Sequence, residues 1–478
     1  MPCPLTTKWG RACLQNAMPR SYRPLYPLPS DITQMSRRTF VAGSVSFAAA
    51  ALFSSRAWGA TTTTQPRFAA YPFSLGIASG DPAPDGFVLW TRLAPHPLEE
   101  NGGMPPESVE VRWQVATDEG MTKVVAQGSA IASAAWAHSV HVEVTGLKPD
   151  RWYWYQFKAG SETSQKGRTR TMPPAGSTPD RLRFVFASCQ HYEAGFYTAY
   201  EHMAREDLDL ILHLGDYIYE GAARPEQPRR HNSGELMSLH DYRARYALYK
   251  LDPALQAVHT QVPWIVTWDD HEVVNNYAND LPGKADSMTR DAFLARRAAA
   301  YQAYYEHMPL RRSALPAGPD MLLYRRLPVG QLAEVHILDT RQYRTDQPCG
   351  DGNKPPCPDA LNPQATALGL TQRDWLFHGL DHSPSTWNVL AQQIMMARVD
   401  RSPGPDFAVS MDQWPGYEIE RRKVLRHFHE RKTKNPVVLT GDIHSNWVNE
   451  LVIDFDRPDS LAVATEFVGT SISSGGNG

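Results

Sequence analysis

The sequence predicts an all-β sandwich followed by an α/β domain with layered sheets, and three observations support this prediction. Residues 73–171 contain short runs in which apolar and polar residues alternate, whereas later runs are continuously apolar. Alternation is typical of strands with one face in a core, and continuous apolar runs are typical of strands buried on both faces. The segment 171–179 (TMPPAGSTP) separates the two patterns. We therefore expect the sandwich over residues 68–172 and the α/β domain over residues 180–478.

Three alternating runs define the expected sandwich: residues 109–115, 139–144 and 152–157. Such short strands with turn residues between them are typical of β-sandwiches. The spacing of Leu147, Pro149 and Tyr153 resembles the corner of fibronectin type III domains, in which a tyrosine hydroxyl ties a strand to the preceding loop. We assign these residues to packing rather than to function.

Five apolar runs of strand length define the α/β domain: residues 183–187, 208–214, 264–268, 332–338 and 436–440. Stretches with helical character, such as 197–205 and 292–307, lie between them. Strands and helices that alternate in this way predict helices packed on sheets.

Length and charge limit the possible classes of protein. A chain of 478 residues is too long for one ordinary core, so two domains and a processed leader are expected. The net charge is -3, from 48 basic and 51 acidic residues, and the sequence contains no long basic run. A nucleic-acid-binding surface is therefore not indicated. The content of 42% hydrophobic and 21% charged residues is that of a soluble globular protein.

The N-terminal region has the pattern of an export signal. Arg37 and Arg38 precede an apolar run at residues 41–53, which is shorter than the roughly 20 residues that span a bilayer. Small residues follow near residue 59, so residues 35–59 are interpreted as a signal peptide of the twin-arginine route. A buried core helix is the alternative. Residues 1–34 lack any pattern and are interpreted as a non-native upstream extension.

Export sets the expected location and partners of the protein. We expect a periplasmic or secreted monomer with no stable membrane anchor after cleavage, and the twin-arginine translocase as its partner during export. In an oxidising compartment, Cys349 and Cys357 would close a turn-rich loop as a local disulfide. Cys189 is then unpaired, and either metal ligation or buried packing would explain it.

Polar residues follow four of the apolar strands. Cys189 and Asp216 come after the first two, the cluster at 269–271 (DDH) comes after the third, and Asp442 with His444 comes after the last. The carboxyl ends of strands in an α/β sheet are the usual position of a site. A single Asp there is more often a turn residue or a helix cap. Four such ends together indicate a functional site.

Three motifs in the same region resemble those of PhoD-type alkaline phosphatases, in the metallophosphoesterase-like superfamily. They are residues 213–220 (HLGDYIYE), 268–277 (WDDHEVVNNY) and 439–447 (LTGDIHSNW). The resemblance covers residues 73–478 and includes four further segments: 76–82 (GIASGDP), 88–92 (VLWTR), 338–344 (LDTRQYR) and 465–471 (TEFVGTS). It implies a leading sandwich, a layered α-β-β-α catalytic domain and hydrolysis of phosphate esters.

The resemblance also implies a metal cluster. Cys189, Tyr219 and His444 would bind Fe³⁺ together with Asp216, and a phenolate and a thiolate are donors that suit a trivalent iron. Asp216 would bridge to a second site. Three residues would offer only oxygen atoms there, which suits about two Ca²⁺ ions: Asp270, Asn276 and Asp442. Sequence alone does not separate Asn276 from Asn275.

Three residues are expected to act in catalysis: His271, Asp216 and Arg341. The resemblance implies that His271 lies near the phosphate and the leaving group, and the alternative is a supporting histidine held by Glu272. Arg341 and Arg344 could contact phosphate oxygens in bidentate fashion. The alternative for both arginines is a surface ion pair. Cations on both sides of a bridging Asp216 would stabilise the transition state and lower the pKa of water.

Two other functions and one departure from the family accompany this interpretation. A phosphodiesterase or phospholipase D-like hydrolase could use the same scaffold, because selectivity would reside in loops such as 221–234. A non-catalytic sugar- or surface-binding module is the second alternative, although the polar residues kept at four strand ends argue against it.

The chain stops within a glycine-rich stretch at residues 475–478, where family members continue. We therefore expect the catalytic domain to be C-terminally incomplete and to lack a covering segment.

Overall fold

The computed structural model describes residues 66–283, 288–457 and 459–475. The expected signal peptide at 35–59 and the upstream extension at 1–34 lie outside these ranges. Within them, none of the helices combines the length and the apolar character needed to cross a bilayer.

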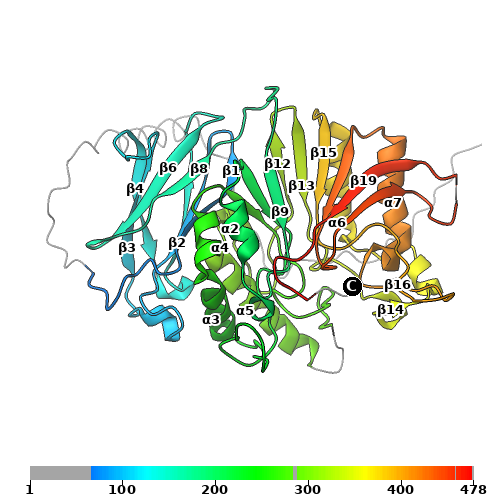
Figure 1. Ribbon diagram of the computed structural model, residues 1–478, viewed down its shortest axis with the longest axis horizontal. Coiled ribbons are helices and arrows are strands. Elements are labelled where there is room, and N and C mark those ends of the chain that lie inside the picture. The colour runs from blue at the N-terminus through cyan, green and yellow to red at the C-terminus, as the bar shows by residue number, and fades with distance from the viewer. Residues whose placement is uncertain (1–65, 284–287, 458, 476–478) are drawn as a thin grey trace, which may run out of the picture. The chain divides into compact units, whose positions relative to one another are not determined.

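The first large sheet contains strands from both halves of the chain (Figure 1). Its order is β5 (Ser139–Val144), β2 (Gly86–Arg92), β1 (Ile77–Ala83), β11 (Trp264–Val266), β10 (Leu210–His213) and β9 (Phe184–Ala187). Strand β1 pairs in parallel with β11, where Gly80 lies opposite Trp264. A Cβ atom on Gly80 would lie 2.7 Å from the Trp264 carbonyl oxygen, so this close pairing requires glycine.

The sandwich is therefore not a separate body. The sequence pattern changes at residues 171–179, but the sheet continues from the N-terminal strands into the catalytic strands. A second sheet packs on β5, β2 and β1 and contains β3 (Val109–Ala116), β4 (Val124–Ala132), β6 (Trp152–Ala159), β7 (Glu162–Thr163) and β8 (Gly167–Arg170). The Tyr153 hydroxyl donates to the Lys148 carbonyl at 3.0 Å, as the predicted corner requires.

The second large sheet belongs to the catalytic half alone. Its order is β12 (Arg325–Val329), β13 (Ala333–Ile337), β15 (Trp387–Ala391), β17 (Pro436–Thr440), β19 (Ala462–Val468) and β18 (Trp447–Val452). The four central strands are parallel, and β12 and β18 are antiparallel edges. The carboxyl ends of the parallel strands consequently lie at one edge of the sheet.

The two large sheets pack face to face, and helices cover their outer faces. Leu212 and Ile265 of the first sheet lie in one core with Val335, Val389 and Leu439 of the second. The outer face of the first sheet is covered by α2 (Thr198–Met203), α3 (Leu239–Lys250), α4 (Pro253–His259) and α5 (Arg290–His307). Helices α6 (Gly369–His382) and α7 (Glu418–Glu430) cover the second sheet (Figure 1). Burial on both faces explains why these strands are continuously apolar.

Short elements complete the described chain. They are β14 (Asn353–Lys354), β16 (Val409–Ser410) and the 3-10 helices η1 (Glu100–Gly103), η2 (Ala134–Trp136), η3 (Tyr192–Ala194), η4 (Arg312–Ala314), η5 (Pro348–Gly350), η6 (Pro358–Leu361) and η7 (Trp414–Tyr417). Cys349 and Cys357 form the predicted disulfide in the loop that contains β14, and Cys189 is free and buried.

Local sequence explains where two of the helices begin. Ser238 and Asp241 form a capping box at α3, because the Asp241 carboxylate accepts from the Ser238 amide at 2.8 Å while the Ser238 hydroxyl accepts from the Asp241 amide. Asp252 caps α4, and Pro253 occupies its first position, where no amide hydrogen is needed. These caps satisfy backbone amides at the helix ends and fix the residues at which α3 and α4 begin.

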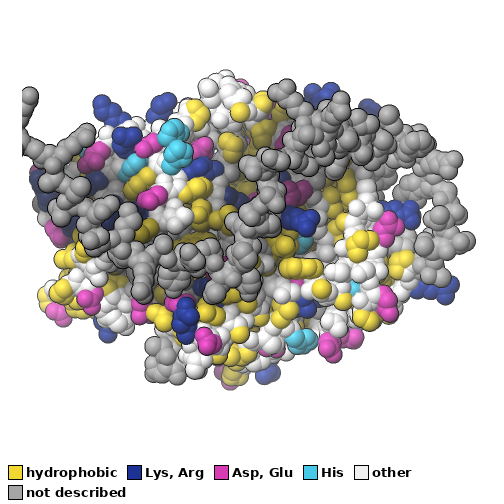
Figure 2. All heavy atoms as spheres, turned by 180° about the vertical axis from the view of Figure 1, so that it is seen from behind, with side chains coloured by type: hydrophobic (Ala, Val, Ile, Leu, Met, Phe, Trp, Pro, Cys, Tyr) yellow, Lys and Arg dark blue, Asp and Glu magenta, His cyan; other side chains and the backbone are white. Residues whose placement is uncertain are grey.

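The surface carries charges of both signs. On the face seen in Figure 2, Lys and Arg side chains are interspersed with Asp and Glu side chains over the visible atoms. This mixture agrees with the small net charge of -3.

Candidate active site

The parallel strands bring the predicted ligands together at one edge. Cys189 follows β9, Asp216 follows β10, Asp270 follows β11, and Asp442 and His444 follow β17. At this edge, three groups have ligand atoms that lie within 4.8 Å of one another: Cys189, Asp216 and His444; Asp216, Asp270 and His271; and Asp216, Asp269, Asp270 and Asp442. Asp216 belongs to all three groups, which is the position expected of a bridging carboxylate.

The backbone at this edge has an unusual conformation. Five of the predicted ligands have positive φ angles: Cys189 (59°), Asp216 (58°), Asn276 (54°), Asp442 (64°) and His444 (57°). Residues other than glycine rarely adopt this region. Each such residue costs about 1–3 kcal/mol, and such residues cluster at functional sites. The surrounding fold thus holds these five side chains in a strained arrangement.

Gly215 allows two of the strand ends to approach each other. Its φ is 115°, and a Cβ atom there would lie 2.5 Å from the Asp269 amide nitrogen. Its carbonyl accepts from the Cys189 amide at 3.1 Å. Glycine at this position therefore sets the spacing between the turns that present Cys189, Asp216 and Asp269.

Tyr219 contacts the same cluster through its hydroxyl group. This hydroxyl donates to Asp216 Oδ2 at 2.9 Å and lies 3.3 Å from His444 Nε2. It also lies 2.7 Å from the hydroxyl of Ser474, which follows β19. Burial, together with the charge of Asp216, raises the pKa of Tyr219 well above its usual value. An ionised phenolate at this position would need a cation beside it.

The buried carboxylates also indicate a cation. Burial raises the pKa of Asp216 well above its usual value and the pKa of Asp442 to about 7, and neighbouring carboxylates add to both rises. Among the described residues, Asp216 Oδ1, Asp269 Oδ2 and Asp270 Oδ1 are buried without a hydrogen-bond partner. Unpaired buried charge is very unfavourable. The carboxylate oxygens of the cluster suit hard cations, and the thiol and imidazole groups suit transition metals, so the donor set fits a metal centre.

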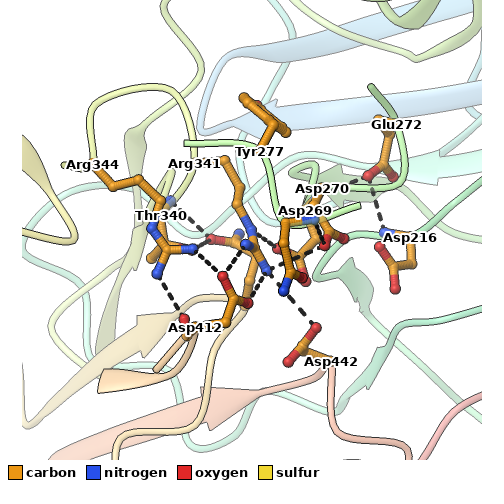
Figure 3. A network of polar contacts seen from close by, with 12 residues as sticks. Asp216, Asp269, Asp270, Glu272, Tyr277, Thr340, Arg341, Arg344, Asp412 and Asp442 are labelled. Atoms are coloured by element: carbon orange, nitrogen blue, oxygen red, sulfur yellow. Dashed lines mark hydrogen bonds and ion pairs between the residues drawn. The ribbon is translucent and has the colours of Figure 1, made fainter. Parts of the chain in front are cut away.

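Arg341 is placed differently from what the sequence suggested. Its guanidinium group is fully buried, with Nε 2.5 Å from Asp269 and the two terminal nitrogens 2.7 and 2.8 Å from Asp412 (Figure 3). It lies 3.6 Å from Asp270 and 3.9 Å from Asp442. Arg341 therefore contacts the carboxylates of the cluster, and these contacts occupy the nitrogens that were expected to meet a phosphate.

Arg344 and Asp412 belong to the same network. Arg344 is buried and donates to the Asp412 carboxylate at 2.8 Å and to the Asp412 carbonyl at 2.6 Å. The alternative of exposed surface ion pairs is wrong for both arginines, because neither has an exposed side chain. The two guanidinium groups hold the pKa of Asp412 well below its usual range, although burial alone would raise it. Asp412 follows no predicted strand, so sequence reasoning missed it.

His271 is oriented by Glu220. Its Nδ1 lies 2.6 Å from Glu220 Oε2. Burial would lower the pKa of His271, but Glu220, Asp270 and Asp216 raise it well above its usual value. Glu272, which we expected as the alternative partner, instead accepts from the amides of Asp216, Tyr217 and Asp269. The alternative named the wrong partner: Glu220 contacts His271, and Glu272 joins the turns after β10 and β11.

The two adjacent asparagines have different environments. The Asn276 amide donates to Asp270 Oδ2 at 2.7 Å, and its side chain donates to Asp351 at 2.8 Å. Asn275 has an exposed side chain, and its backbone amide donates to Glu220. Of the two, Asn276 lies beside the carboxylates of the cluster.

A pocket of about 200 Å³ opens beside the cluster. Its lining residues are Asn276, Met395, Ala397, Val399, Arg401, Ser410, Asp412, Gln413, Pro415, Asp442, Ile443 and His444. Three of the predicted ligands thus line one part of the pocket. A substrate bound in the pocket would reach the cluster there.

Two family descriptions match the chain. "PhoD-like phosphatase" matches residues 184–478, and "PhoD-like phosphatase, N-terminal domain" matches residues 59–173. The chain belongs to the PhoD-like phosphatase family. The resemblance predicted from the three motifs is therefore confirmed, and membership of this family makes the chain a phosphoric ester hydrolase.

Two known proteins resemble this PhoD-like phosphatase closely. Alkaline phosphatase D of Bacillus subtilis (strain 168) is 53% identical over 418 residues, which are 86% of this chain and 71% of the relative. A solved structure of PhoD is also 53% identical, with a TM-score of 0.83 over 86% of this chain and 80% of that chain. The fold of this PhoD-like phosphatase therefore matches that of the solved structure over both halves of the described chain.

Proposed function

We propose that this chain is an exported alkaline phosphatase that hydrolyses phosphate esters at a cluster of Fe³⁺ and Ca²⁺ ions. The position of Asp216 is the main support, because this buried carboxylate belongs to all three candidate metal groups at the strand ends and keeps one unpartnered oxygen. A carboxylate with this placement suits a bridge between two cations.

The donor atoms support a division of the cluster into two parts. Cys189, Tyr219 and His444 offer sulfur, phenol and imidazole donors beside Asp216, and we assign them to Fe³⁺. Asp270, Asn276 and Asp442 offer oxygen atoms, and we assign them to about two Ca²⁺ ions. When bound, these cations would supply Lewis acidity to the phosphate and lower the pKa of water.

The protein side chains position the substrate and move a proton. His271, held through Nδ1 by Glu220, keeps Nε2 available, and we propose that it serves the leaving oxygen as a general acid. Arg341 was expected to contact phosphate, but it pairs with Asp269 and Asp412. We therefore propose that it positions the carboxylates of the cluster. By reducing the repulsion among buried carboxylates, Arg341 helps to keep Asp270 ionised, and the pKa of Asp270 is lowered although burial opposes this.

Hydrolysis of phosphodiesters is the second candidate. The pocket extends from Asn276 and His444 along Met395 and Val399, so it has room for more than a phosphate group. Comparing p-nitrophenyl phosphate with its bis ester would decide between a monoesterase and a diesterase of the phosphodiesterase or phospholipase D-like kind. A higher kcat/KM for the bis ester would favour the diesterase, and a higher kcat/KM for p-nitrophenyl phosphate would favour the monoesterase.

Export by the twin-arginine route remains part of the proposal, with a periplasmic or secreted monomer as its product. The disulfide between Cys349 and Cys357 supports it, because disulfides persist in oxidising compartments. Replacing both Arg37 and Arg38 by lysine should abolish export, measured by fractionation of cells. Unchanged export would contradict the assignment of this route.

Metal analysis tests the central proposal. The purified protein should contain iron and calcium and show a visible charge-transfer band from Tyr219 or Cys189. Chelation of calcium should abolish activity and leave much of the colour, because the iron has its own donors. A colourless and fully active protein that contains zinc and no iron would refute the cluster proposed here.

A further inference from the structure

The pocket beside the cluster has a second polar end, at Arg401. Arg401 lines the pocket together with Ser410, and its side chain is half-buried. No carboxylate within the described ranges pairs with its guanidinium group, whereas Arg398, three residues earlier, binds Asp456 at 2.5 Å. The pocket beside the cluster therefore contains the positive charge of Arg401, with which no carboxylate of the described residues forms an ion pair.

The loop that contains Arg401 is fixed at its base. The Arg401 amide donates to the Ala408 carbonyl at 2.7 Å. The Asp400 carboxylate accepts from the amides of Ser402 and Ala408 at 3.0 and 3.1 Å, which closes the turn below Arg401. These bonds hold the Arg401 backbone in place, so a ligand need not order this part of the loop.

An apolar wall connects Arg401 to the cluster. Met395, Ala397, Val399 and Arg401 line the pocket at every second position, as residues of an extended segment do. At the start of the wall, the amides of Met396 and Ala397 donate to the buried Glu466 carboxylate at 2.7 and 2.9 Å, which fixes the segment to β19. The pocket thus presents the cluster, then apolar side chains, then one unpaired guanidinium group.

The one other charged group in the pocket, outside the cluster, is already neutralised. Asp412 lines the pocket, but Arg341 and Arg344 bind its carboxylate. It therefore does not cancel the positive charge of Arg401. An anionic group that enters this end of the pocket meets a net attraction, and guanidinium binds carboxylates and phosphates with two parallel hydrogen bonds.

We propose that Arg401 binds an anionic group on the leaving part of the substrate, remote from the phosphate that is cleaved. Met395 and Val399 would contact the hydrocarbon between the two groups. The inference rests on the proposed phosphatase function and specifies its substrate class: phosphate esters whose alcohol carries a carboxylate, a sulfonate or a second phosphate. These groups share the charge and oxygen geometry that guanidinium recognises.

A matched pair of substrates tests this proposal. Phenyl phosphate and 4-carboxyphenyl phosphate differ by one remote carboxylate, so the ratio of their kcat/KM values isolates that group. A change in metal content or in folding alters kcat/KM by the same factor for both substrates, so it cancels in the ratio. For Arg401→Gln we expect the preference for 4-carboxyphenyl phosphate to fall roughly five- to tenfold, mostly through KM, as for a partly exposed ion pair. Arg401→Lys should keep part of the preference, because the charge remains without the planar fork.

Arg398→Gln is the control, because it removes the same charge from the same loop at a residue that does not line the pocket. The ratio of kcat/KM for 4-carboxyphenyl phosphate to kcat/KM for phenyl phosphate should be the same in Arg398→Gln as in the wild-type protein. An unchanged ratio in Arg401→Gln, or an equal fall in Arg398→Gln, would overturn the inference while the phosphatase function stands. Failure of the wild-type metal-loaded protein to hydrolyse either ester would overturn both.

Discussion

Lys250 gives a prediction about stability that does not depend on the metal cluster. It is the last residue of α3, is 2% exposed, and lies with its ammonium group 4.2 Å from the centre of the Trp90 ring. No acidic side chain of the described residues pairs with it. Burial lowers its pKa from 10.5 to about 7. Replacement of Lys250 by methionine removes the titrating group and keeps a side chain of similar length.

The sign of the effect follows from the two pKa values. Above about pH 7 the folded protein has a neutral Lys250, whereas the unfolded chain keeps the proton until its pKa of 10.5. The unfolded state binds more protons in this window, so the free energy of unfolding rises with pH. One pH unit is worth about 1.36 kcal/mol for one proton, which gives about 2.7 kcal/mol between about pH 7 and pH 9.

The assay is urea unfolding of the wild-type protein and Lys250→Met at several pH values, with metals and ionic strength held constant. Other titrating groups affect both proteins equally, so the difference between them reports Lys250 alone. Nearby His259 and His307 have pKa values lowered well below normal by burial, so they stay neutral in this window. Lys250→Met should be more stable than the wild-type protein at pH 7, and this advantage should shrink by about 2.7 kcal/mol by pH 9. Parallel pH profiles would refute this reasoning.

The site allows three further predictions. His271→Ala should keep near-normal metal content and lose roughly 10²- to 10⁴-fold in kcat, whereas His444→Ala should lose iron; equal loss of metal in both would make His271 a ligand. Asp216→Asn should lower both metal occupancy and activity, measured by elemental analysis and turnover, and full occupancy would exclude a bridging role. Arg341→Met should lower the free energy of unfolding by about 3–5 kcal/mol, because the buried Asp269 loses its cationic partner and Asp412 keeps only Arg344. The exposed Arg431→Met should cost less than about 1 kcal/mol, and equal losses would contradict the distinction.

The strands of the catalytic half that could be predicted were those with an unbroken apolar sequence. Continuous apolar runs predicted β9, β10, β11, β13 and β17, because these strands pack against apolar cores on both faces of their sheets. Strand β19 was not predicted, since Glu466 interrupts its apolar pattern. The Glu466 carboxylate accepts from two backbone amides near β15, so a polar residue in this strand has a structural role that only the folded chain reveals.

The candidate site was predictable where it lies at strand ends and follows motifs. Cys189, Asp216, Asp442 and His444 could be selected because parallel strands bring their ends together. The partners of these residues could not be selected in the same way. Whether His271 meets Glu220 or Glu272, and whether Arg341 faces a phosphate or Asp412, depends on side-chain directions that the spacing along the sequence does not fix.

The pairing of β1 with β11 also constrains how the chain folds. Gly80 meets Trp264 across the sheet, and the Trp90 indole donates to the Glu306 carbonyl at 2.9 Å. Strand β1 can pair with β2 as soon as both are made, but its other edge finds β11 only after part of the catalytic half has been synthesised. Contacts between such distant segments carry a large loop-closure entropy and slow folding. Until β11 and α5 are present, one edge of the N-terminal strands stays unpaired, so the N-terminal half is poorly suited to fold or to be transferred to another protein by itself.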